Sequence, residues 1–235
     1  MLVLLLLQWD VPYDALSKED AAAVRAVLDR EHLTVDLDRT RVDSTLDVYT
    51  FCMERLDFTG KLAGVLSEAT YDITCDADLA PRGETVTERM RRTFLVDDGD
   101  GMVALMTRVY AADGRWIFVS RGRYEMDLLT VKSRAVIIVN AVPDEGALDT
   151  TARIFMRVDE GVGSIAAGLF EDAVRDAVRD KSTLFIAAAR TATEAAQKDP
   201  ARVSRLAGLA DGIDRGVLAD FRKKCLNRSD GRDTN

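Results

Sequence analysis

The sequence has one histidine, His32, and three cysteines that lie far apart. A single histidine excludes a multi-histidine metal site within the chain, and a catalytic triad would have to use His32, which lies in a polar stretch. Because no CxxC pair is present, a zinc ribbon or thioredoxin-type redox site is excluded. We therefore expect Cys52, Cys75 and Cys225 to be free thiols in a reducing compartment, with no metal and no cofactor.

Long apolar runs and early basic residues are also missing. The apolar run Met1–Leu7 is much shorter than the ~20 residues of a membrane span. No lysine or arginine precedes Lys18, although a signal peptide needs a basic start. The run is a strand, a misassigned start or a degraded export signal. We expect a cytoplasmic protein without stable membrane insertion, and an exported form stays open.

Positive charge is scarce, since the net charge is -8 and the isoelectric point about 4.9. Nucleic-acid binding requires basic surface, so we expect no nucleic-acid partner. The same deficit argues against non-specific docking on anionic membranes. With 235 residues and 47% hydrophobic side chains, the chain can still bury a substantial core.

The first half of the chain contains helical periodicity around one strand. Ser17–Arg30 begins with a residue that can cap a helix and continues with apolar residues at helical spacing. Leu33–Val42 alternates apolar and polar residues, which predicts a strand. A second helix is predicted from Ser44 or Thr45 to Leu66, with glycines weakening its second half.

From Tyr71 onward, alternation and turn residues predict an antiparallel meander. Asp113-Gly114 is a strong hairpin signal, because both residues tolerate the positive φ of a type I′ turn. Asp97–Gly101 is interpreted as another turn; as a calcium loop starting at Asp98, it would have Val109 where a bidentate glutamate is needed. The expected strands are Tyr71–Asp78, Thr85–Val96, Met102–Tyr110, Trp116–Met126, Ala135–Val142 and Asp149–Val158.

The longest helix is predicted over Ile165–Gln197 and ends before Pro200. It carries a stripe at three- and four-residue spacing that includes Val174, Val178, Lys181 and Phe185. A shorter helix is expected over Ala201–Leu209, with further helical structure up to Leu226 and a disordered end beyond it.

This element order resembles the helix-grip fold of the START-like superfamily, also called SRPBCC, which includes lipid-transfer proteins and polyketide cyclases. The resemblance covers Leu33–Gln197 and rests on element order, on Arg121–Leu129 (RGRYEMDLL) and on the apolar run Ala135–Val142. It implies an α+β fold in which a curved antiparallel sheet surrounds the long C-terminal helix and leaves a cavity for sterols, lipids, polyketides or plant hormones. The expected domains are an extension with one helix (1–32), the helix-grip domain (33–199) and a helical tail (200–235).

The even-numbered residues of the meander mix large, small and methionine side chains on one face, which suits an adaptable pocket and a packed core equally. Arg108 lies among apolar neighbours and either anchors an anionic headgroup, reaches the rim, or pairs with an acid such as Asp127. With Arg108 as the polar anchor, the proposed cavity walls are Met106, Tyr110, Trp116, Phe118, Tyr124, Met156 and Phe170.

Three functions follow from this pattern. The first is binding or transport of a hydrophobic small molecule or lipid in an internal cavity. The second is a non-catalytic structural module with a filled core, whose acidic surface and C-terminal helices would contact a protein partner. The third is a cyclase- or hydrolase-like enzyme that would need tyrosine or carboxylate acid–base groups inside the cavity, because histidine is nearly absent. No catalytic residue is assigned.

Overall fold

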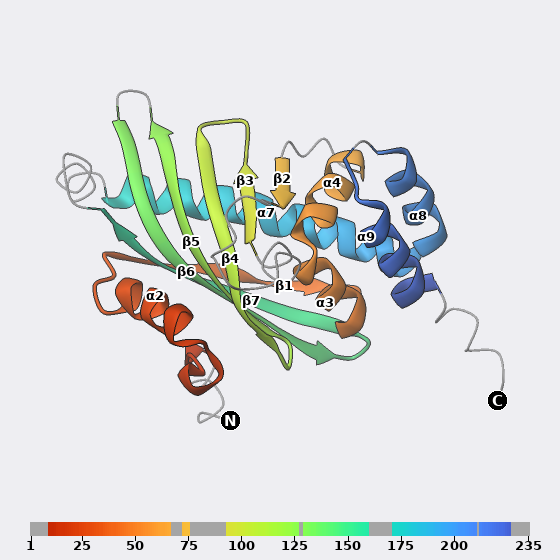
Figure 1. Ribbon diagram of the computed structural model, residues 1–235, viewed down its shortest axis with the longest axis horizontal. Helices are drawn as coiled ribbons and strands as arrows, with labels where there is room; N and C mark the ends of the chain where they lie inside the picture. Colours follow the sequence, from red (N-terminus) through yellow and green to blue (C-terminus); the bar gives the residue numbers. More distant parts are fainter. Residues whose placement is uncertain are drawn as a thin grey trace.

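The computed structural model describes residues 9–66, 72–75, 93–126, 129–159, 171–210 and 212–226. A seven-stranded antiparallel sheet in the order β1-β7-β6-β5-β4-β3-β2 lies across the long helix α7, and α2 covers part of the opposite face (Figure 1). The strands are β1 (Leu33–Val42), β2 (Asp72–Cys75), β3 (Thr93–Asp97), β4 (Met102–Ala112), β5 (Arg115–Met126), β6 (Leu129–Asp144) and β7 (Ala147–Val158). The principal helices are α2 (Lys18–Leu28), α3 (Leu46–Glu54), α4 (Leu56–Leu66), α7 (Glu171–Lys198), α8 (Pro200–Leu209) and α9 (Arg215–Phe221).

This arrangement confirms the expected α+β fold with a curved antiparallel sheet and a long C-terminal helix. The predicted cap of the first helix is also present, since the Ser17 hydroxyl accepts a 3.0 Å hydrogen bond from the Asp20 amide. Val24 and Val27 of α2 then pack on Ile117 and Ile138 of the sheet. The N-terminal helix therefore closes part of the outer face of the sheet.

The β4–β5 hairpin turns at the predicted Asp113-Gly114 pair, where φ is 52° and 74°. Gly114 is required for space as well, because an added Cβ would lie 2.3 Å from the Ala141 carbonyl oxygen of β6. The amide of Ala141 donates a 2.7 Å hydrogen bond to the Gly114 carbonyl, which holds the turn against the neighbouring strand. The turn is thus tied into the sheet.

Replacing Gly114 with alanine should lower the free energy of unfolding by about 2 kcal/mol or more, since the change adds a backbone clash to a disfavoured φ. Gly146→Ala is the matched control, because its φ is 83° but nothing lies within 4 Å of an added Cβ. The control should lose only about 1 kcal/mol. Urea denaturation of both variants measures the difference, and equal losses would show that the close approach to β6 is unimportant.

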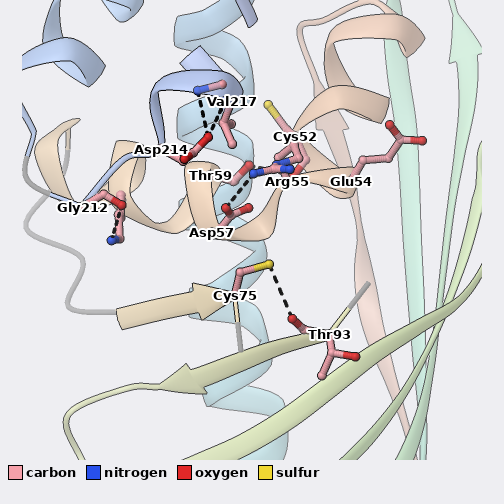
Figure 2. A network of polar contacts seen from close by, with 12 residues as sticks. Cys52, Glu54, Arg55, Asp57, Thr59, Cys75, Thr93, Gly212, Asp214 and Val217 are labelled. Carbon is pink, nitrogen blue, oxygen red and sulfur yellow. Dashed lines mark hydrogen bonds and ion pairs between the residues drawn. The ribbon is translucent and has the colours of Figure 1, made fainter. Parts of the chain in front are cut away.

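The predicted helix over residues 44–66 is divided at Arg55, which has φ −124° and ψ 63°. Figure 2 shows how the break is stabilised: Arg55 forms an ion pair with Asp57 at 3.0 Å, and the Thr59 hydroxyl donates to the Cys52 carbonyl at 2.7 Å. The last carbonyls of a helix have no hydrogen-bond partner within the helix, and the Thr59 hydroxyl supplies one for the Cys52 carbonyl. The two short helices α3 and α4 therefore replace the single expected one.

A second core lies at one end of the molecule, where α3, α4, α8 and α9 surround the C-terminal part of α7. Its centre is an aromatic cluster of Phe51, Phe58 and Phe221, with ring centroids 5.2–5.5 Å apart. Ala188 and Ala192 of α7 pack in the same cluster. The helical tail after residue 200 is therefore packed on the preceding elements. The expected disordered end (227–235) lies outside the described residues.

A candidate ligand cavity between the sheet and the long helix

A partly open cavity of about 150 Å³ lies between the inner face of the sheet and the N-terminal part of α7. Met106, Tyr124 and Met156 form much of the wall on the sheet side. Val174, Val178 and Phe185 of α7 close the opposite side. These α7 residues belong to the predicted stripe, because side chains three and four residues apart lie on one helix face. Most of the cavity wall is consequently apolar.

A few polar groups interrupt the apolar wall. Ser120 of β5, Ser133 of β6 and Ser182 of α7 line the cavity. Serine hydroxyls can both donate and accept a hydrogen bond. A few polar groups within a mainly apolar wall are the usual means of orienting a bound small molecule.

Lys181 joins α7 to the turn between β3 and β4 beside this cavity. Its ammonium lies 2.7 Å from the carboxylate of Asp98 and 2.6 Å from that of Asp100. The Asp98 side chain is only 4% exposed and that of Lys181 16%, so this ion pair is largely removed from water. The Asp98 carboxylate also accepts the backbone amides of Asp100 and Met102 at 2.8 and 2.9 Å. One side chain of α7 is thus fixed to the rim of the sheet.

The electrostatics of this contact favour both charged forms. Burial alone raises the pKa of Asp98, but the hydrogen bonds from Lys181 and from the Asp100 and Met102 amides outweigh it and hold the pKa below its usual value. Burial likewise opposes the charge on Lys181, whereas its hydrogen bonds to Asp100 and Asp98 raise its pKa above the usual value. The pair is therefore ionised at neutral pH.

A smaller cavity of about 40 Å³ lies further along α7 and shares wall residues with the first. Met106, Ile154 and Phe185 line both. Phe118 lines only the smaller one and is 1% exposed. Since methionine side chains adapt their shape easily, Met106 is well placed to move between these two spaces.

The predicted wall residues occupy different surroundings. Met106, Tyr124 and Met156 line the larger cavity and Phe118 the smaller. Trp116 lies on the same inner face, but Tyr49 of α3 packs edge-on against it at 5.4 Å. The inner face is therefore hollow beneath α7 and filled beneath α3. Phe170 lies outside the described residues.

Two of the proposed residues lie elsewhere. Arg108, the proposed polar anchor, donates a 3.2 Å hydrogen bond to the Glu54 carbonyl at the end of α3. That carbonyl satisfies a half-buried guanidinium because helix ends expose unpaired oxygens. Tyr110 packs with the cluster beneath α2 on the outer face. The cause is a β-bulge between Arg108 and Tyr110, which reverses the alternation of side chains along β4.

The residue that sequence reasoning did not assign to the site is Lys181. The signal was available, since this lysine interrupts an otherwise apolar helical stripe. A cation in such a position needs a partner, and the aspartates of the Asp97–Gly101 turn provide it. Within the described ranges, no three histidine, cysteine or acidic side chains gather as metal ligands. None of the described helices combines the length and apolarity needed to span a membrane.

The sheet that curls over one long helix, with a cavity between them, places this chain in the helix-grip class of α+β proteins. No protein-family model and no curated protein sequence matches the chain. Among solved structures, Ara h 8.0201 matches 68% of this chain and 97% of its own, with 11% identity and a TM-score of 0.43. The protein TTHA0849 from Thermus thermophilus matches 71% of this chain and 100% of its own, with 9% identity and a TM-score of 0.40. Similarities this low identify neither family nor ligand.

Proposed function

We propose that this protein binds a small hydrophobic molecule in the cavity between its sheet and α7. The observation that carries the proposal is a partly open, mostly apolar space of about 150 Å³ that is bordered by residues of the hydrophobic core. Tight packing is the rule in protein interiors, and voids larger than a water molecule are few. Apolar surface that is left uncovered in a concave space of this size is a marker of a ligand site. The cavity thus favours ligand binding over the alternative of a structural module with a filled core.

The size of the space limits the ligand. An apolar cavity of roughly 150 Å³ holds a benzene-sized molecule, and sites for drug-sized ligands measure about 300–1,000 Å³. We propose a ligand with one ring or a short chain and one neutral polar group for the serine hydroxyls. A sterol or a two-chain lipid would require the sheet and α7 to separate. The START-like superfamily remains the proposed relationship, supported by element order and by the position of the cavity.

Binding is favoured over catalysis by the chemistry of the wall. Among its described lining residues only Arg123 and Lys181 carry charge, the Arg123 side chain extends from the outer face of the sheet, and no carboxylate lines it. Acid–base catalysis needs a group whose pKa lies near neutral pH and whose position allows proton transfer. Lys181 is held by two carboxylates in its charged form. Its ammonium is therefore committed to a structural contact.

Filling the cavity should abolish binding. Ala135 lines the cavity from β6, so Ala135→Phe would place an aromatic ring inside it. Isothermal titration of the purified protein with toluene and indole should show uptake by the unmodified protein and none by this variant. Ala201→Phe, on the exposed side of α8, is the matched control and should bind normally. Equal uptake by the Ala135→Phe variant, with its folding verified by circular dichroism, would contradict the assignment of the site.

Native mass spectrometry of the purified protein provides an independent test. A bound hydrophobe at one molecule per chain, identified after denaturing extraction, would establish the chemical class of the natural ligand. A ligand-free mass that is unchanged by toluene, indole, fatty acids or sterols would favour the filled-core module.

A further inference from the structure

The outer face of the sheet contains a second hollow, of about 770 Å³, with α2 as one wall. The strands β3 and β4 contribute apolar side chains to its floor: Leu95, Val103 and Leu105. The strands β5 and β6 contribute cationic ones: Arg121, Arg123, Lys132 and Arg134. Ala26 and Val27 line the hollow from α2. Apolar and basic surface are therefore separated within one concave site, on the face opposite the ligand cavity.

In the basic half of this hollow, like charges lie opposite each other on paired strands. Arg121 lies directly opposite Arg134 across β5 and β6, and Arg123 lies opposite Lys132. Arg134 is in turn opposite Arg157 of β7. Like charges in such positions destabilise a sheet. Their concentration here, in a chain with a net charge of -8, indicates a role other than stabilising the fold.

The charges of the hollow are only partly compensated within the protein. Arg134 lies 3.3 Å from Asp159 and Arg123 lies 3.6 Å from Glu125, and at least one member of each pair is more than half exposed. Exposed pairs of this kind contribute little free energy. No ion pair joins Arg121 or Lys132 to an acid in the part of the chain that the structure describes. The hollow therefore presents uncompensated positive charge.

We propose that this hollow docks an acidic, amphipathic helical segment of a partner protein. The concave shape beside α2 admits a protruding segment, whereas a flat membrane surface could not fill it. Strand addition is excluded, because β3, β4, β5 and β6 each pair with strands on both sides. A helix with leucine-like anchors at i, i+3, i+4 and i+7 would contact the apolar half of the hollow. Acidic residues beside those anchors would contact its basic half. A long polyanion would meet repulsion from the acidic remainder of the chain.

The test uses the full chain and a labelled synthetic helix that carries leucine at those positions and glutamate elsewhere. Fluorescence anisotropy should show binding that weakens as salt is added. Arg121→Glu combined with Lys132→Glu should weaken binding by roughly tenfold or more. Each introduced carboxylate faces a remaining cation across the strand pair, so the variant should melt at the same or a higher temperature. Weaker binding therefore cannot be attributed to unfolding.

The matched control is Arg179→Glu combined with Arg190→Glu, which reverses the same amount of charge on the exposed side of α7 and should bind like the unmodified protein. Replacing the glutamates of the peptide with lysine should abolish binding. Absence of peptide binding, equal binding by the Arg121→Glu/Lys132→Glu variant, or a lower melting temperature for it would overturn the proposal. Tighter binding to phosphatidylserine vesicles or to a thymidine oligonucleotide than to the peptide would overturn the choice of partner.

Discussion

Replacing Phe221 with alanine should lower the free energy of unfolding by about 3–5 kcal/mol. The Phe221 ring is completely buried and contacts Phe51 and Phe58 at centroid distances of 5.5 and 5.2 Å. Removing it leaves a cavity at the junction of α3, α4 and α9, and the surrounding helices can only partly collapse into it. Urea denaturation followed by circular dichroism measures the loss.

Leu209→Ala is the control for this experiment, because Leu209 lies on the same tail but is 83% exposed. It should change stability by no more than about 0.5 kcal/mol. A loss below about 1 kcal/mol for Phe221→Ala would mean that the tail contributes little to the fold. A large loss in one cooperative transition would show that the tail and the helix-grip elements unfold together.

Replacing Lys181 with methionine should cost about 2–4 kcal/mol, because it leaves the buried Asp98 carboxylate without its cation. Methionine keeps most of the apolar length of the lysine side chain, so the change mainly removes charge. Adding Asp98→Asn to this variant should recover part of the loss, since a neutral amide needs no counterion. A double-mutant cycle by urea denaturation gives the coupling between the two side chains.

The Lys181–Asp98 pair also predicts a pH dependence. The pKa of Asp98 is lowered in the folded protein, so its contribution is complete above the unfolded value of about 3.9 and is lost as pH falls through the lower folded value. The pKa of Lys181 is raised, so its contribution is present below about 10.4 and is lost as pH rises through the folded value. The protein that carries both Lys181→Met and Asp98→Asn should lack both dependences. If its free energy of unfolding varied with pH as that of the unmodified protein does, the pairing would be refuted.

Local sequence signals were sufficient for much of the fold. The Asp113-Gly114 turn and the Ser17 cap depend on the conformations of a few adjacent residues, so they could be identified without knowing the rest of the chain. The stripe on α7 likewise follows from its spacing. The extent of β6 was underestimated, because Leu129–Arg134 is mixed in polarity and becomes a strand by pairing on both sides.

The site depended on features that single-residue patterns do not carry. A bulge near Val109 places Tyr110 on the outer face of the sheet. The assignment of faces by alternating residue numbers is therefore wrong beyond the bulge. The inner face is hollow beneath α7 yet filled beneath α3, which depends on where Tyr49 meets Trp116. The break at Arg55 arises from the Asp57 ion pair and the Thr59 hydrogen bond, which the helical periodicity concealed.

The net charge of the chain does not show how charge is distributed over its surface. A value of -8 describes the whole chain and predicts its average behaviour in solution. It does not show that strand pairing places Arg121 beside Arg134 and Arg123 beside Lys132. Register concentrates these four cations on one face, and that face can act as a basic surface on an acidic protein.

The unequal support of α7 has a mechanical consequence. Ala188 and Ala192 are fixed in the second core, whereas Val174 rests against the cavity. Val174 lies about 21 Å from Ala188 along the helix at 1.5 Å per residue, so this part of α7 could tilt about the second core. A tilt of about 5° would displace Val174 by about 2 Å. Such a tilt would enlarge the cavity while leaving the aromatic cluster around Phe221 in place, and the Lys181–Asp98 contact would oppose it.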